Sequence, residues 1–278
     1  MREKGLEIAA FVEYLWEEER EQGTVEKYRR DVCLFMVWAG EREMSKSLIT
    51  AWKEHLKMQG YKPETINGKL SALNKFLRFT GREECRVKPL HIQRRLFRGG
   101  KKDLSKNEYL HLVDTAVNLG RHRLALLMET ICATGIRVSE VKYITLEAIR
   151  NGYAEILLKG KIRTILIPGK LCRKLEKYAK KQKIASGELF VTRSGKGLTR
   201  RQIWAEMKAI CHAAGVESSK VFPHNLRHLF ARTFYRACRD IAKLADVLGH
   251  SSIETTRIYL ISTGVEHARQ LNRLGLVS

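Results

Sequence analysis

His224 and Arg227, near the end of the chain, combine an imidazole with a guanidinium at a spacing that suits anion binding. They stand three residues apart in a segment that begins with Pro223, a residue favoured at the first position of a helix. At this spacing both side chains lie on one face of the first turn, where unpaired N–H groups and the helix dipole favour negative charge. Taken alone, His224 would be a helix-capping histidine. His224 and His228 also have the i, i+4 spacing of zinc-binding helices, but a metalloprotease helix needs glutamate where this chain has Asn225. We expect no metal ion and no other cofactor.

Three further residues could take part in the same chemistry. His250 ends the segment Leu248–His250 and directly precedes a predicted capping box, Ser251–Glu254. The helix that follows carries Tyr259, and a phenol becomes a nucleophile once a nearby acceptor or cationic field helps to remove its proton. Arg137 follows a Thr-Gly break between two apolar helical stretches. By themselves, Tyr259 could be a core aromatic residue and Arg137 a helix cap.

Together these segments resemble the tyrosine recombinase (phage integrase) family. Its members carry a T-G-x-R-x-x-E box, an H-x-x-R box, an L-G-H box, and a tyrosine nine residues after the last histidine. This chain has the four elements in the same order, at Thr134–Glu140, His224–Arg227, Leu248–His250 and Tyr259. The motifs place the resemblance over residues 100–278, and a pattern of four helices extends it to residues 1–80.

The resemblance implies how a DNA phosphate would be bound. Arg137 and Arg227 would bind its non-bridging oxygens, because a planar guanidinium offers paired donors to the charge that develops there. His250 would donate a hydrogen bond to the same phosphate. Glu140, one turn after Arg137, would orient that arginine and the groups behind it.

The resemblance also implies how the strand would be cut. Tyr259 would attack the phosphorus and form a 3′-phosphotyrosine, while His224 would manage the proton of the nucleophile. A lysine in a β-hairpin after the first box would protonate the leaving 5′ oxygen as general acid. Lys159 matches this lysine best, and Lys161 is the alternative because the turn is shorter than is usual in the family.

The resemblance implies that the first part of the chain, residues 1–81, is a four-helix DNA-binding domain of the core-binding, SAM-like type. Apolar residues recur at helical spacing in four stretches. Thr24 is the expected N-cap of the second helix, and Pro63 and Gly81 bound the fourth. The fourth helix carries three basic residues on its outer face that could equally meet phosphates or only aid solubility: Lys69, Lys75 and Arg78.

A basic linker is predicted over residues 82–103. It has little periodicity and contains Gly99-Gly100, which is typical of a flexible connection. Its candidate DNA contacts are Arg94, Arg95, Lys101 and Lys102.

The second part, residues 104–278, is predicted to be a mostly helical catalytic domain with a small antiparallel β-sheet, so the fold class is mainly α. Ser105–Glu108 is a capping box that starts the first helix. Tyr153–Leu158 and Arg163–Ile167 read as a hairpin, and a helix is expected from about Thr199 to Ala214. A short amphipathic tail, residues 262–278, would dock on a neighbouring protomer as is common in the family.

Composition agrees with a DNA-binding enzyme. The chain has 52 Lys and Arg against 30 Asp and Glu, a formal charge of +22. Residues 1–98 hold 20 basic and 15 acidic side chains, and residues 99–278 hold 32 and 15, so the excess is concentrated in the second part. Such an excess favours nucleic acid as a partner. The six cysteines have no zinc-site spacing and are expected to be reduced thiols.

The resemblance therefore implies a site-specific recombinase of the two-domain type, and we expect it to have no arm-binding domain of the lambda-integrase type. Its expected partners are double-stranded DNA with paired half-sites and further copies of itself in a tetramer, with no membrane and with any accessory DNA-bending or directionality factor unidentified. The expected location is cytoplasmic, at the nucleoid. Because the hairpin and tail depart from the usual Xer pattern, integration, excision or inversion of a mobile element is the expected role. The alternatives are a monomeric type IB topoisomerase and a DNA-binding regulator that has lost catalysis.

Overall fold

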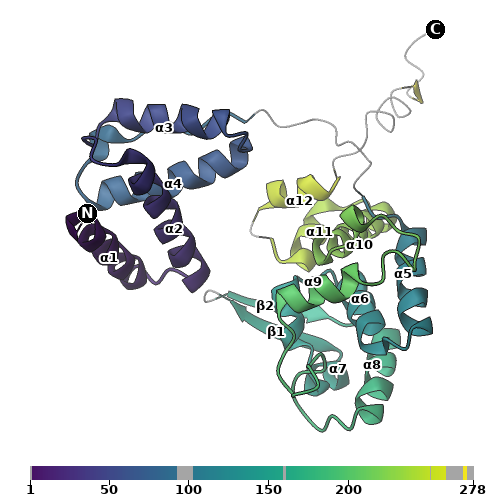
Figure 1. Cartoon of the computed structure of the whole chain (residues 1–278). Helices are drawn as coiled ribbons and strands as arrows, with labels where there is room; N and C mark the ends of the chain where they lie inside the picture. Colours follow the sequence, from purple (N-terminus) through teal and green to yellow (C-terminus); the bar gives the residue numbers. More distant parts are fainter. Residues whose placement is uncertain (1, 93–102, 159–160, 251, 261–271, 274–278) are drawn as a thin grey trace. The chain divides into compact units, whose positions relative to one another are not determined.

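A computed structural model describes residues 2–92, 103–158, 161–250, 252–260 and 272–273 of the chain. The chain divides into two compact units, Met1–Arg94 and Arg95–Ser278 (Figure 1). In the part of the chain that the structure describes, the helices are too short or too polar to cross a bilayer.

The first unit consists of four helices packed around one apolar core. The helices are α1 (Arg2–Glu17), α2 (Gln22–Ala39), α3 (Lys46–Met58) and α4 (Pro63–Phe79), followed by the short 3₁₀ helix η1 (Glu83–Cys85). Aromatic rings from all four helices meet inside, where Phe11 lies edge-on to Phe76 and Phe35 to Trp52, with centroids 5.2 and 5.0 Å apart. The predicted helical bundle is confirmed.

The start of α2 differs from the prediction. The N–H groups of Thr24 and Val25 both donate to the carbonyl of Glu21, so Thr24 already lies inside the helix. Glu21 occupies the N-cap position and makes no side-chain cap. The predicted Thr24 cap is therefore wrong.

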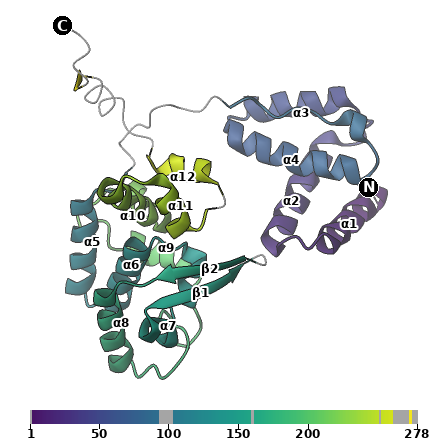
Figure 2. The ribbon, with the colours of Figure 1, turned by 180° about the vertical axis from the view of Figure 1, so that it is seen from behind.

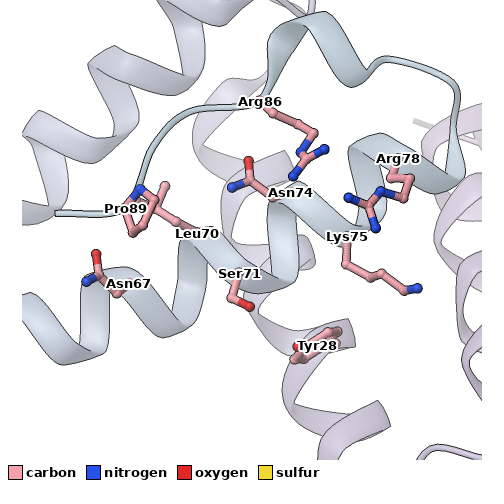
Figure 3. A pocket seen from close by; sticks show the side chains of 9 residues that line it. All are labelled: Tyr28, Asn67, Leu70, Ser71, Asn74, Lys75, Arg78, Arg86 and Pro89. Atoms are coloured by element: carbon pink, nitrogen blue, oxygen red, sulfur yellow. The ribbon is translucent and has the colours of Figure 1, made fainter. Parts of the chain in front are cut away.

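The segment after α4 is packed rather than extended as a flexible linker from residue 82. Cys85 and Val87 are buried in the first core. Asn74 donates to the carbonyl of Val87 and accepts from its N–H, and Asn67 does the same for Leu90, at 2.7–3.3 Å. Figure 3 shows both asparagines on α4 beneath this segment. The first unit thus extends beyond the predicted boundary at residue 81.

The second unit is helical apart from one hairpin. Its first half contains α5 (Lys106–Asn118), α6 (His122–Thr134), η3 (Val138–Tyr143), α7 (Leu146–Asn151), β1 (Tyr153–Leu158), β2 (Lys161–Leu166) and α8 (Gly169–Lys181). Its second half contains α9 (Arg200–Lys208), η4 (Ser218–Lys220), α10 (Pro223–Cys238), α11 (Ile241–Leu248) and α12 (Ile253–Leu260). The strands are antiparallel, with Tyr153 opposite Leu166 and Ile156 opposite Arg163.

Most of the helix caps and ends that the sequence predicts in this unit agree with the structure. Both hydrogen bonds of the capping box Ser105–Glu108 form. Thr199 caps α9, but that helix ends at Lys208 instead of Ala214, because the chain tightens into turns in which the N–H of Cys211 bonds to the carbonyl of Lys208. The second predicted capping box begins at Ser251, which lies outside the described residues.

Three helices late in the chain close over the end of α6. Figures 1 and 2 show α10 between α6 and the pair α11 and α12. A small apolar cluster holds them together and includes Leu244, Leu248 and Tyr259. This packing brings the loop after α6, the start of α10 and the turn after α11 to one place.

Candidate active site

Arg227 is the most deeply buried arginine of the site. It is 2% exposed, on the first turns of α10. Its Nη1 donates to the carbonyl of Gly135, and its Nη2 donates to the carbonyl of Leu248 at 2.9 Å. Burial, together with the nearby charge of Arg137, lowers the pKa of Arg227 to about 10, so it stays charged at neutral pH. A buried cation held by carbonyl groups is well placed to attract an anion.

Arg137 is held by Glu140 and leaves its guanidinium accessible. Glu140 is completely buried, and its carboxylate accepts from both the N–H and the Nη1 of Arg137 at 2.8 Å. Burial would raise the pKa of this carboxyl, but the bonds from Arg137 and the charge of Arg163 keep it below its usual value. The Arg137 side chain remains 42% exposed. The geometry agrees with the orienting role that the resemblance implies for Glu140.

His250 is joined directly to Arg227. Its Nε2 lies 2.9 Å from Nη2 of Arg227, and its Nδ1 lies 2.8 Å from the hydroxyl of the buried Thr256. Because arginine can only donate, Nε2 accepts here and Nδ1 carries the proton. Burial and the charges of Arg227, Arg137 and Arg163 lower the pKa of His250 to about 4. In this state His250 is neutral, so donation to a phosphate from Nε2 requires a proton on that nitrogen, gained either by exchange of tautomer or by proton uptake.

Tyr259 is surrounded by three histidines. It is 6% exposed, and its ring centroid lies 5.6 Å from His224, 4.9 Å from His228 and 5.7 Å from His250. The ring of His250 stacks on that of Tyr259 and its Nε2 lies 2.9 Å from Arg227, so His250 links the tyrosine to that guanidinium. The structure therefore brings Tyr259, His224, His250 and Arg227 together.

Other predicted site residues fall outside this cluster or outside the described residues. Lys159, Arg94, Arg95, Lys101 and Lys102 lie in the segments that the structure does not describe. Lys161 begins β2 opposite Leu158 in the backbone register.

The three candidate DNA contacts on α4 belong to the first unit and are engaged with acidic residues. Lys69 pairs with Asp31 at 3.3 Å, Lys75 with Glu18 at 2.5 Å and Arg78 with Glu83 at 2.9 Å. Lys75 and Arg78 border a hollow of about 300 Å³ (Figure 3). Only Arg78 keeps more than half of its side chain exposed, at 54%.

Sequence reasoning missed Arg163. Its guanidinium donates to both oxygens of Glu140 at 2.8 Å and to the carbonyl of Val247 at 3.0 Å. A signal was present, because strand residues two apart share a face. Arg163 lies on the same face as Ile165 and Ile167, which are both buried. A charged side chain on this inward face therefore required a partner.

Comparison with known proteins settles the family. The phage integrase family pattern matches residues 102–264, and the phage integrase N-terminal SAM-like domain matches residues 8–84. The chain belongs to the phage integrase family. Tyrosine recombinase XerA of Thermococcus kodakarensis is 30% identical over 97% of this chain and 95% of its own length. Tyrosine recombinase XerD of Vibrio cholerae is 28% identical over 95% and 94%.

Solved structures of integrases share the fold. The Tn1549 transposon integrase in complex with transposon right end DNA matches with a TM-score of 0.72 at 16% identity, over 96% of this chain and 99% of that one. A lambda integrase dimer bound to a COC′ core site matches with a TM-score of 0.71 at 18% identity, over 92% and 94%. The predicted family, fold class and tyrosine-type site-specific recombinase are confirmed. In the described residues no group of three His, Cys, Asp or Glu side chains could hold a metal.

Proposed function

We propose that Tyr259 is the nucleophile with which this integrase-family recombinase cuts and rejoins DNA. The observation that carries the proposal is the buried Arg227, which contacts His250 at 2.9 Å, while the ring of Tyr259 stacks on that of His250 with centroids 5.7 Å apart. A phosphate bound to that guanidinium would lie within reach of the tyrosine oxygen. Arg137, held by Glu140 but open to solvent, would bind the same phosphate from the other side.

The charges favour a bound phosphodiester. The site concentrates positive charge: burial and the charge of Arg137 lower the pKa of Arg163, and burial and the charges of both these arginines lower the pKa of Arg227. The carboxylate of Glu140 pairs with Arg137 and Arg163. One phosphate charge would offset part of this excess, and more negative charge develops on its oxygens as the phenol attacks. The positive charge of the site therefore stabilises the transition state more than it stabilises the unreacted phosphodiester.

Each step can be written with the groups of the chain. The phenol oxygen of Tyr259 bonds to phosphorus while its proton passes to His224, and the bond to the 5′ oxygen breaks. The leaving oxygen takes a proton from the hairpin lysine, Lys159 or Lys161. The resulting 3′-phosphotyrosine is close in energy to the bond it replaced, so attack by a 5′ hydroxyl of another strand reverses the chemistry and joins the new pair.

Assembly and role are part of the proposal. Relatives of the fold have been seen as a lambda integrase dimer at a core site and as a tetramer on a Holliday junction. We expect this chain to bind paired half-sites and to assemble as a tetramer on DNA, at the nucleoid in the cytoplasm. The curated relatives have Xer names, whereas the hairpin and tail led us to predict a mobile-element or inversion role. Mapping the DNA that is recovered covalently bound to the protein would decide between them.

The test of the nucleophile is Tyr259→Phe. The variant should form no SDS-resistant adduct on cognate DNA, while its affinity for a half-site stays within about twofold, because affinity comes from many phosphate contacts. Tyr235→Phe, on α10, is a matched control that should form the adduct normally. An adduct formed by Tyr259→Phe would refute the assignment.

A further inference from the structure

Arg163 reaches across the second unit to the two segments that carry Arg137 and His250. It stands on β2, with its side chain 13% exposed. One terminal nitrogen holds the carboxylate of Glu140, and the other holds the carbonyl of Val247, 84 residues away in sequence. Its Nε has no hydrogen-bond partner among the described residues, so the two terminal nitrogens fix the guanidinium.

The contact with Glu140 extends to Arg137. The same carboxylate accepts from Arg163 and from the backbone and side chain of Arg137, all at 2.8 Å. Because Glu140 is fully buried, its charge depends on these two arginines for compensation. A loss of Arg163 would leave the carboxylate with half of its cationic partners and with room to turn away from Arg137.

The contact with Val247 extends to His250. Val247 lies in the last turn of α11, and Gly249 follows in the left-handed region at φ 62°. A Cβ added to Gly249 would lie 2.2 Å from Cδ and 2.4 Å from Nε of Arg163. The stem of Arg163 therefore lies against the backbone of Gly249, directly before His250.

We propose that Arg163 is a positioning residue that fixes Arg137 and the His250 turn relative to each other. It bridges a buried carboxylate and a backbone carbonyl with a single rigid guanidinium, and both terminal nitrogens are already engaged, so it need not touch the phosphate itself. The inference rests on the proposed function, since it assigns Arg137 and His250 to one phosphate.

The first test is Arg163→Lys, which keeps the charge but cannot bond to Glu140 and Val247 together. Arg123→Lys is a matched control, because Arg123 also bridges a carboxylate, that of Glu206 at 2.6 Å, and a backbone carbonyl, that of Val191. In single-turnover reactions with prebound DNA, Arg163→Lys should cleave at least tenfold more slowly than Arg123→Lys. Half-site affinity should change less than about twofold in both.

The second test addresses the contact with Gly249. Gly249→Ala places its methyl group against Arg163, whereas Gly152→Ala has the same left-handed strain, at φ 78°, with no atom within 4 Å. Gly249→Ala should lower the cleavage rate at least tenfold relative to Gly152→Ala without lowering half-site affinity. In an Arg163→Ala background, Gly249→Ala should add less than about threefold.

The outcomes separate the inference from the proposed function. Thermal melting of each variant identifies any loss of folded protein. In a variant that remains folded, a slower cleavage rate with unchanged half-site affinity then indicates a positioning role. Cleavage by Arg163→Lys within twofold of Arg123→Lys would overturn the inference, as would undiminished effects of Gly249→Ala in the Arg163→Ala background. If instead the unsubstituted chain formed no adduct through Tyr259, the proposed function itself would fail.

Discussion

Arg227 and Arg137 are held differently, so the same substitution should have different consequences. Arg227 is buried and donates to two carbonyls and His250, and Arg227→Lys would leave some of these groups unpaired. We expect a loss of about 1–3 kcal/mol in the free energy of unfolding. Arg137 is 42% exposed and its backbone N–H would keep its bond to Glu140, so Arg137→Lys should cost less stability than Arg227→Lys.

Cleavage, in contrast, should fall in both variants by on the order of 100-fold, because an ammonium does not reproduce paired guanidinium donors. Thermal melting and single-turnover cleavage measure the two effects separately. Near-normal cleavage by either variant would remove that arginine from the site.

The low pKa of His250 predicts a pH dependence of stability. Its pKa is about 4 in the folded chain and about 6.5 in an unfolded one, so the unfolded state binds more protons between these values. Stability should therefore fall as pH decreases from 6.5 to 4, by at most about 3 kcal/mol from this residue, and by less because its ring is partly exposed to solvent. His250→Gln should flatten the curve of unfolding free energy over that window. An unchanged curve would show that His250 is not held neutral.

At this scale the sequence predicted the residues for which we propose direct chemistry and also Glu140 as the partner of Arg137, but not Arg163. Arg137, Arg227, His250 and Tyr259 stand in motifs with fixed spacing. The contacts of Arg163 with Val247 and Glu140 join segments far apart in the chain, and they exist only after β2 packs against α11 and η3. Local patterns do not contain that information.

At the scale of elements, helix α4 carries two kinds of basic residue: Lys75 is mostly buried in contacts with other side chains, and Arg78 is exposed at the surface. Lys75 is 18% exposed and donates to Glu18 and to the hydroxyl of Tyr14, which joins α4 to α1. Hydrogen bonds from Lys75 and Tyr14 lower the pKa of Glu18 to about 2. Burial disfavours the charge on Lys75, but the bonds to Glu18 and Tyr14 outweigh it and raise its pKa. Arg78 is more exposed and pairs with Glu83 at the surface.

We therefore predict that Lys75→Met lowers the stability of the protein by about 1–2 kcal/mol. Arg78→Met should change stability by less than about 0.5 kcal/mol. If α4 meets DNA, Arg78→Met should reduce half-site affinity and the steepness of its salt dependence. Urea unfolding and binding titrations at several salt concentrations measure both. Equal stability losses in the two variants would contradict this distinction.

Element boundaries were the least predictable part of the fold. Periodicity gave the helices of the first unit, because an amphipathic helix repeats its apolar positions. It did not show that Asn67 and Asn74, seven residues apart on α4, hold the backbone of Leu90 and Val87 with their side-chain amides. In the sequence, the segment after residue 81 looks like a linker because the two asparagine side chains that hold its backbone in place lie outside it, on α4.

At the scale of the whole molecule, the predicted docking of the C-terminal tail distinguishes a recombinase assembly from a single acting copy. The tail lies almost wholly outside the described residues, so its role remains a prediction from the sequence. Truncation after Ile261 removes Leu271 and Leu274 but retains Tyr259 and the basic residues at 82–102. A tail that docks on a neighbouring copy would contribute to assembly, since burying two leucines is worth roughly 3–6 kcal/mol before the cost of ordering the tail.

The truncated protein should then bind single half-sites with unchanged affinity and salt dependence. It should lose cooperative binding to paired half-sites and fail to recombine them, as gel-shift titrations and a recombination assay on paired sites would show. The double substitution Leu271→Ser and Leu274→Ser in the full chain should reproduce both losses, which separates the apolar contact from the mere length of the tail. If the tail packs on its own domain instead, truncation should lower the melting temperature and weaken half-site binding as well. Recombination at the full-length rate would exclude the docking role, because assembly would then depend on contacts made by the rest of the chain.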